Sequence, residues 1–270
     1  MRHIPTAVAA TLAIATTAAV LAGCGSVGAV HQGGFNLISL DQEWAMRDQM
    51  RQQVEAQKQV VNDPAAEAYL NQLGQRIVAR TALAGRPWSF GIVRDDSVNA
   101  FNLPGGLVYV NSGLLAHATK LDQLTGVLAH EIGHGVARHG TQLMSRQYGL
   151  DVLASVALGQ NPGAAKQILA QVVGTGILNS YSREAESEAD SLGVKYAWQA
   201  GYDPHGLPDF FRKLESMKQS DASLVARFFA SHPLDAQRIA STSAEIARLP
   251  RKSGLVVDTP EYDRFQARWR

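Results

Sequence analysis

Residues 130–134 read His-Glu-Ile-Gly-His, and their side chains are the best suited to metal chemistry in this chain. Apolar residues recur around them at three- and four-residue steps, which predicts a helix: Leu121, Leu124, Leu128 and Ile132. Because residues four apart lie one above the other on a helix, His130 and His134 should aim their imidazoles at one point. Two neutral imidazoles suit Zn²⁺, and Glu131 beside them could take a proton from an activated water. The alternative is a helix with two histidines that happen to face the core.

A second informative stretch, residues 182–190, holds four acidic side chains in a segment whose apolar pattern is again helical. Glu186 and Asp190 are one turn apart on one face, whereas Glu184 and Glu188 lie about 160° away from Glu186. Glu186 could therefore supply a third metal ligand, and Asp190 is placed to accept the free ring N–H of a ligand histidine. We expect Glu184 and Glu188 to face solvent.

Three ordered motifs, at residues 99–106, 130–134 and 182–190, resemble the HtpX/Oma-like and CAAX-prenyl-protease family of zinc metallopeptidases, especially its small periplasmic lipoprotein members. The resemblance covers roughly residues 60–245. It implies one Zn²⁺ per chain, with His130, His134 and Glu186 as ligands, Asp190 as their support and Glu131 as general base. It also implies an α+β fold, mainly helical and zincin-like, with a small β-sheet beside the H-E-x-x-H helix.

Two other residues are assigned to the site with their roles left open. Arg183 is either an ion-pair partner of Glu186, three residues on, or a stabiliser of the site. In similar proteins the element that starts at Ser231-His232-Pro233 lies near the metal, which implies a catalytic role for His232. His232 could stabilise the oxyanion or bind zinc in a resting state. The alternative is a helix-capping loop, and Pro233 is expected to open the helix that follows.

Three β-type runs precede the H-E-x-x-H helix, at residues 88–93, 97–103 and 107–110. Pro104-Gly105-Gly106 separates the last two and predicts a turn between paired strands. An extended substrate could add to an exposed edge of this sheet through main-chain hydrogen bonds. Asn99, Ala100 and Phe101 are the candidate substrate-binding residues, although a small sheet that only packs on helices would have the same pattern.

Residues 1–23 combine a weakly basic start with a short apolar run that is rich in Ala and Thr. With Cys24 next, they resemble a bacterial lipoprotein signal, which implies cleavage before Cys24 and lipidation of that residue, palmitate included. Gly25 follows, with no Asp there to signal inner-membrane retention. We therefore expect a lipid anchor in the outer membrane, with the protein facing the periplasm. An uncleaved transmembrane anchor is the alternative.

The rest of the chain organisation follows from composition and from the Gly- and Pro-containing breaks between segments. With 25 basic and 24 acidic residues and no basic run, the sequence gives no indication of a nucleic-acid partner. We expect a flexible tether at 24–38, a metallopeptidase domain at 39–250 and a C-terminal strand/helix extension at 251–270. Helical segments at 141–158 and 164–173, separated by Asn161-Pro162-Gly163, should form a hairpin around residues 150–176 that is either buried or lies over the active-site cleft.

These features predict a zinc-dependent endopeptidase of the bacterial cell envelope that serves protein quality control. Its expected partners are unfolded or misassembled envelope proteins, as substrates, and the outer membrane, through lipid on Cys24. The alternative is a chaperone-like or scaffold lipoprotein that uses the same zinc-bound fold. A zinc hydrolase of non-peptide substrates is a third, weaker hypothesis.

Overall fold

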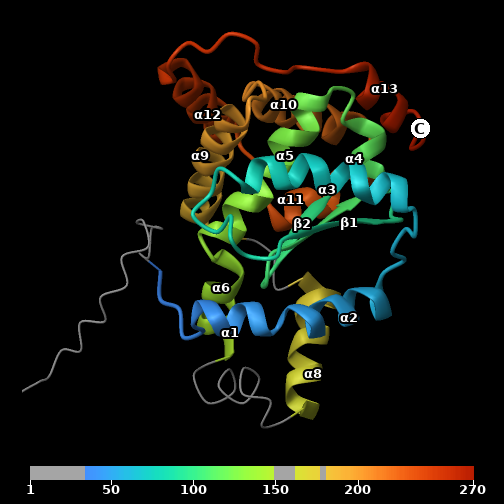
Figure 1. The fold of residues 1–270 in the computed structure, drawn as a ribbon, viewed down its shortest axis with the longest axis vertical. Helices are drawn as coiled ribbons and strands as arrows, with labels where there is room; N and C mark the ends of the chain where they lie inside the picture. The colour runs from blue at the N-terminus through green and yellow to red at the C-terminus, as the bar shows by residue number, and fades with distance from the viewer. Residues whose placement is uncertain (1–33, 149–161, 177–180) are drawn as a thin grey trace, which may run out of the picture.

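The computed structural model describes residues 34–148, 162–176 and 181–270 (Figure 1). The expected signal peptide, Cys24, residues 24–33 of the tether and residues 150–161 of the hairpin lie outside the described residues. The described chain is mainly helical with one three-stranded sheet, so the predicted fold class is confirmed. Within these ranges, no helix combines the length and the apolar character needed to cross a membrane.

The sheet contains β1 (Ser89–Val93), β2 (Ala100–Leu103) and β3 (Leu107–Asn111) in the order β1-β3-β2. β3 is parallel to β1 and antiparallel to β2. The antiparallel pair of β2 and β3 confirms the predicted pairing of strands around the Pro-Gly-Gly turn. Gly105 and Gly106 have φ angles of 88° and 70°, a left-handed conformation that glycine adopts without strain. Part of the outer edge of β1 is bonded to residues 59–61, whereas β2 has no second partner strand in the described ranges.

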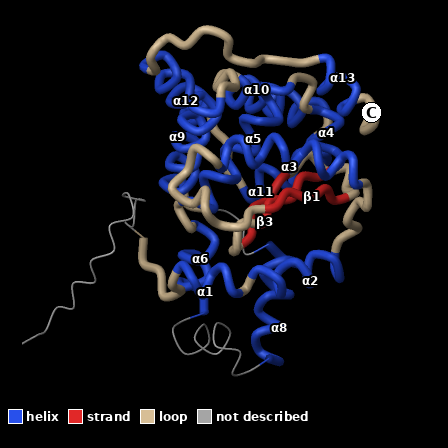
Figure 2. The backbone as a smooth tube through the Cα atoms, in the orientation of Figure 1, coloured by secondary structure: helices blue, strands red, loops and turns tan. Residues whose placement is uncertain are grey.

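Alternate side chains of β3 enter two separate hydrophobic cores. Val108 and Val110 belong to the main core, and Leu107 and Tyr109 belong to a smaller one on the other face. Helices α3 (Pro64–Val78), α4 (Ser112–His117) and α5 (Leu121–Val136) contribute to the main core. Helices α1 (Leu40–Ala45) and α2 (Arg47–Gln57) run beneath the sheet in Figure 2, where the smaller core includes Met50 and Val54 of α2.

The rest of the described chain is helical. Its elements are α6 (His139–Tyr148), α8 (Pro162–Gln171), the π-helix η1 (Val172–Gly176), α9 (Arg183–Ala200), α10 (Gly206–Ser220), α11 (Ala222–Ser231), α12 (Ala236–Arg248) and α13 (Pro260–Gln266). The prediction that Pro233 opens a helix is wrong: α12 starts later, because the Asp235 side chain accepts a hydrogen bond from the Arg238 N–H and caps it. Tyr262 and Phe265 of α13 bury their rings in the main core.

Helix α5 lies at the centre of the molecule, and all its residues are buried (Figure 1). It packs most closely on α9, where glycines let the two backbones approach. A Cβ atom at Gly193 would lie 3.0 Å from the backbone nitrogen of His130, and one at Gly133 would lie 2.9 Å from the carbonyl oxygen of Ala189. This close approach sets the N-terminal half of α9 over the H-E-x-x-H residues.

Substitution of Gly193 by valine should separate α5 from α9. Its Cβ would press on the His130 backbone, which cannot move aside as a flexible side chain could, so we expect a loss of about 1–3 kcal/mol in the free energy of unfolding. Chemical denaturation measures this loss. Gly85→Val is the matched control, because no atom lies within 4 Å of a Cβ there. Equal effects at the two positions would contradict the close-contact argument.

Asp122, in the first turn of α5, makes stability depend on pH. Its side chain is buried, and Oδ1 has no hydrogen-bond partner among the described residues. Burial, aided by the nearby Asp203 and Asp209, raises its pKa from 3.8 to about 6. A raised native pKa means that the protonated form is favoured on folding. The resulting stability is fully present below about pH 4 and is lost as pH rises through about 6.

We therefore expect Asp122→Asn to flatten the pH dependence of unfolding between pH 4 and 7.5. At pH 7.5 it should gain up to about 3 kcal/mol over the parent chain, because no charge is buried. Denaturant titrations at several pH values test this. Asp48→Asn, at an exposed carboxylate, should leave the pH profile unchanged. If the free energy of unfolding depends on pH in the same way in the parent chain and in Asp122→Asn, this role for Asp122 is ruled out.

Candidate metal centre

Four side chains from three parts of the fold converge at the junction of α5 and α9. His130 and His134 come from α5, Glu186 from α9 and His232 from the residue that ends α11. One nitrogen or oxygen of each lies within 4.8 Å of the others, and the four residues are at most 1% exposed. The structure thus brings His232 together with the three residues that the sequence predicted as metal ligands.

The ring nitrogens in this cluster face one another. His134 Nε2 lies 3.0 Å from His130 Nε2 and 3.3 Å from Glu186 Oε1, and His232 Nδ1 lies 3.0 Å from the same oxygen. Burial lowers the pKa of His134 well below its usual value, so its imidazole is neutral. Although burial alone would raise the pKa of Glu186, His232 and His134 hold it well below the usual value, so this carboxylate is ionised.

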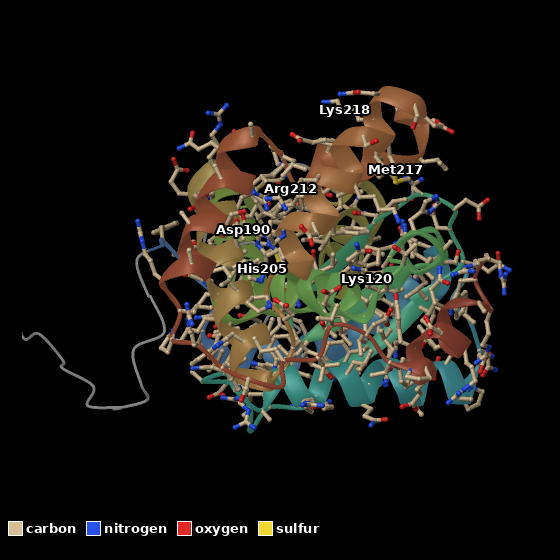
Figure 3. All side chains as sticks on the ribbon, turned by 90° about the horizontal axis from the view of Figure 1, so that it is seen from above. Lys120, Asp190, His205, Arg212, Met217 and Lys218 are labelled. Atoms are coloured by element: carbon tan, nitrogen blue, oxygen red, sulfur yellow. The ribbon has the colours of Figure 1, made fainter. Side chains whose placement is uncertain are left out.

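A second layer of charged groups supports the cluster. Asp190 lies one turn after Glu186, and its Oδ1 is 2.9 Å from Nδ1 of His130, as its spacing suggested. Arg238 of α12 donates to both oxygens of Asp190 at 2.7 Å, and its Nη1 lies 2.7 Å from Glu186 Oε2. In the view from above (Figure 3), Asp190 lies between the helices and not on their outer side. One guanidinium therefore fixes the two carboxylates relative to each other.

The arginine that pairs with Glu186 is Arg238, and not Arg183 as the sequence suggested. The structure does not bring Arg183 to the site: it is the first residue of α9 and its side chain is exposed. The expectation that Glu188 faces solvent is wrong. Glu188 is half-buried, and its Oε2 lies 3.3 Å from Nε2 of His139, whereas Glu184 is exposed as expected.

Glu131 and Tyr181 complete the surroundings. Glu131 is fully buried, its two carboxylate oxygens have no hydrogen-bond partner in the described part of the chain, and Oε1 lies 3.4 Å from His232 Nε2. Burial lowers the pKa of His232, but the carboxylates of Glu186 and Glu131 outweigh burial and raise it overall. The Tyr181 ring stacks on His134 with centroids 4.1 Å apart, a contact for which the sequence gave no signal.

The donors and the local charge both fit a divalent cation. Two imidazoles and a carboxylate are the ligands that Zn²⁺ takes in catalytic sites. Glu131, Glu186 and Asp190, set against Arg238, carry a formal charge of −2 if the histidines are neutral, and all are at least 94% buried. Uncompensated charge is costly away from water, and a cation of charge +2 between His130, His134 and Glu186 would balance it.

The candidate substrate-binding residues lie at the start of the edge strand. Ala100 opens β2 and is buried, Asn99 precedes it, and the Phe101 ring stacks on Tyr109 with centroids 5.5 Å apart. β2 packs against α5, the helix that carries His130 and His134. Their role in substrate binding stays a prediction.

Comparison with known proteins identifies relatives over most of the chain. The family model described as peptidase family M48 matches residues 64–246. The chain is 34% identical over 215 residues to the beta-barrel assembly-enhancing protease of Yersinia pestis, which covers 75% of this chain and 43% of that protein. It is 29% identical over 247 residues to metalloprotease YcaL of Escherichia coli, which covers 84% of this chain and 92% of that protein.

A third relative, the mitochondrial metalloendopeptidase OMA1 of Schizosaccharomyces pombe, is 28% identical over 208 residues, 76% of this chain and 61% of that protein. The chain thus spans less than half the length of the beta-barrel assembly-enhancing protease and nearly all of YcaL.

The paired carboxylates make Arg238 the residue whose loss should be most damaging. Arg238→Ala would leave Asp190 and Glu186 buried without their cation, and we expect it to lower the free energy of unfolding by about 3–5 kcal/mol. Arg183→Ala, at the exposed arginine, should change it by less than about 0.5 kcal/mol. Denaturant titration of both variants in excess chelator measures the effect of the protein charges alone. A similar, small loss in both would remove Arg238 from this role.

Proposed function

The chain belongs to peptidase family M48, a family of metallopeptidases, and from this we propose that it is a zinc-dependent endopeptidase of the bacterial cell envelope. Membership of the family confirms the resemblance drawn from the three sequence motifs. The observation that carries the proposal is the convergence of His130, His134 and Glu186 on one point beside the buried Glu131. The proposed substrates are misfolded or unassembled proteins.

The protein groups have separate tasks in this proposal. Zn²⁺ held by His130, His134 and Glu186 would supply the Lewis acidity that makes water nucleophilic near neutral pH. Glu131 accepts the proton of the attacking water and passes it to the leaving amine. Its carboxylate is suited to this task, because neither oxygen is engaged in a hydrogen bond with the described residues. Asp190 Oδ1, 2.9 Å from Nδ1 of His130, would accept the free ring N–H once the imidazole is turned to the metal, and Arg238 keeps Asp190 in place.

For His232, we propose the role of a fourth donor in the resting state. Its Nδ1 lies 3.0 Å from Glu186 Oε1 and 3.3 Å from His130 Nε2, inside the donor set and not beside it. A catalytic zinc site needs an open position, and a fourth protein donor would fill it. Activity would then require His232 to move away, after which its ring could serve the oxyanion.

The edge of the sheet that β2 forms is the proposed place for the substrate chain. β2 pairs with β3 on one side and has no partner strand on the other within the described residues. An extended peptide could pair there through its main chain, with Asn99, Ala100 and Phe101 next to it. Main-chain pairing selects for unfolded segments more than for a particular sequence, which agrees with a substrate class of misfolded proteins.

The proposed cellular location is the outer membrane, to which lipid on Cys24 would anchor the protein so that it faces the periplasm. It is supported by the signal-like residues 1–23 and by relatives whose names refer to assembly of β-barrels. Unfolded or misassembled envelope proteins are the proposed partners.

Hydrolysis of an unfolded protein is the direct test. The zinc-loaded chain should cut a reduced, unfolded protein, and a chelator should stop the reaction. Glu131→Gln should keep zinc but lower kcat by about 10²–10⁴-fold, because the amide cannot take the proton. Glu184→Gln, on the exposed side of α9, is the control and should retain activity. Equal activity in the Glu131→Gln protein would overturn the mechanism.

The same preparations separate the metal site from the chemistry. Glu186→Ala should lower zinc content in metal analysis, and unchanged content would reassign the third ligand. If the parent chain cuts nothing but suppresses aggregation of the unfolded protein, and Glu131→Gln does so equally well, the chaperone-like alternative is the better account.

A further inference from the structure

His139 is a buried histidine that the proposed mechanism does not use. It lies five residues after His134, its side chain is 4% exposed, and its Nδ1 is 2.9 Å from Nδ1 of His134. On its other side, Nε2 of the same ring lies 3.3 Å from Oε2 of Glu188 on α9. His134, His139 and Glu188 thus form a continuous chain that leads away from the four-donor cluster.

The direction of the protons in this chain follows from the position of His134. Its Nε2 faces His130 Nε2 at 3.0 Å and Glu186 Oε1 at 3.3 Å, so Nε2 is the nitrogen that can bind the metal. A neutral imidazole that offers Nε2 as a lone pair carries its hydrogen on Nδ1. The Nδ1–H of His134 must then donate to Nδ1 of His139, which carries its own hydrogen on Nε2 and donates it to Glu188.

A strained turn brings His139 back to the site. Helix α5 ends at Val136, and Arg138 adopts a φ of 61°, a left-handed conformation that is unfavourable for a residue with a side chain. Arg138 is held in place because its Nε donates to the buried Glu43 at 2.7 Å and its Nη2 donates to the Ile38 carbonyl. The next residue, His139, starts α6 with its ring against His134.

The two histidines of α5 are then supported in parallel ways from α9. His130 faces Asp190 directly, at 2.9 Å, whereas His134 reaches Glu188 only through the ring of His139. We propose that His139 and Glu188 are positioning residues, which hold His134 in the Nδ1–H tautomer and so strengthen its bond to zinc. The inference rests on the proposed zinc site. Hydrogen-bond partners of this kind typically contribute 10–100-fold to metal affinity.

Zinc affinity of histidine variants tests the proposal. Competition with a chromophoric chelator gives the zinc dissociation constant of each zinc-loaded chain. His139→Leu removes the acceptor and should weaken zinc binding by about 10–100-fold. His139→Asn places an amide oxygen near the position of Nδ1, where it can accept the same hydrogen, so it should bind zinc within a few-fold of the parent chain.

Glu188 offers a matched pair of substitutions on one helix. Glu188→Ala should weaken zinc binding, and Glu188→Gln should weaken it less, because its amide oxygen still accepts from His139. Glu184→Ala, at the exposed acid four residues earlier, should have no effect. A purely structural role for His139 would lower the affinity of the Leu and Asn variants alike, and that result, like unchanged affinity in both, would overturn the proposal.

A spectroscopic readout on the parent chain avoids the question of whether variants fold. In a sample labelled with ¹⁵N at histidine, zinc-loaded His134 should give the signals of an Nδ1–H ring and His139 those of an Nε2–H ring. The opposite tautomer at His139 would overturn the inference even if the chain binds zinc as proposed. A parent chain that binds no zinc at all would overturn the proposed function together with this inference, so the two failures are distinguishable.

Discussion

The site depends on the close packing of α5 against α9. Gly193 has no side chain over the backbone of His130, and Gly133 has none against Ala189, so the helices approach more closely than larger residues would allow. Because of this distance, Glu186 can reach His134 at 3.3 Å and Asp190 can reach His130 at 2.9 Å from a separate helix. The three proposed zinc ligands His130, His134 and Glu186 lie on these two helices, so two rigid elements set their relative positions.

The same packing creates an electrostatic requirement. The helices bury Glu131, Glu186 and Asp190, and within the described part of the chain Arg238 is the one arginine that pairs with these carboxylates, at Glu186 and Asp190. A site of this kind is unfavourable by itself, because buried carboxylates lose hydration that one arginine does not replace. Its stability and its affinity for a divalent cation are therefore linked: binding of the cation would stabilise the fold that positions the ligands.

The sequence predicted the parts of the site that lie on one helix face. The four-residue spacing of His130 and His134, and that of Glu186 and Asp190, gives their directions through helical geometry alone. It did not predict which arginine pairs with Glu186. Arg183 is nearer in sequence, but the docking of α12 places Arg238 there, and helical periodicity contains no information on which helices dock.

The incorrect prediction that Glu188 faces solvent has a related cause. On a continued helix, His139 would point about 140° away from His134, and Glu188 would have no partner. The left-handed Arg138 interrupts the helix and changes the direction of the chain, and that conformation is not apparent from an arginine in the sequence. The fold class and the pairing of the strands around the Pro-Gly-Gly turn were predictable, because they depend on local patterns: two β-type runs that flank this turn and long amphipathic helices.

Every residue of α5 is buried, and this limits how the protein can change during evolution. Most helices have a solvent-exposed side on which substitutions accumulate with little effect. Helix α5, in contrast, has the sheet on one side and other helices around the rest. A substitution in α5 must therefore be accompanied by substitutions in the residues that contact it. We expect the sixteen residues of α5 to vary little among functional descendants, while specificity diverges through the strand edge and the surrounding helices.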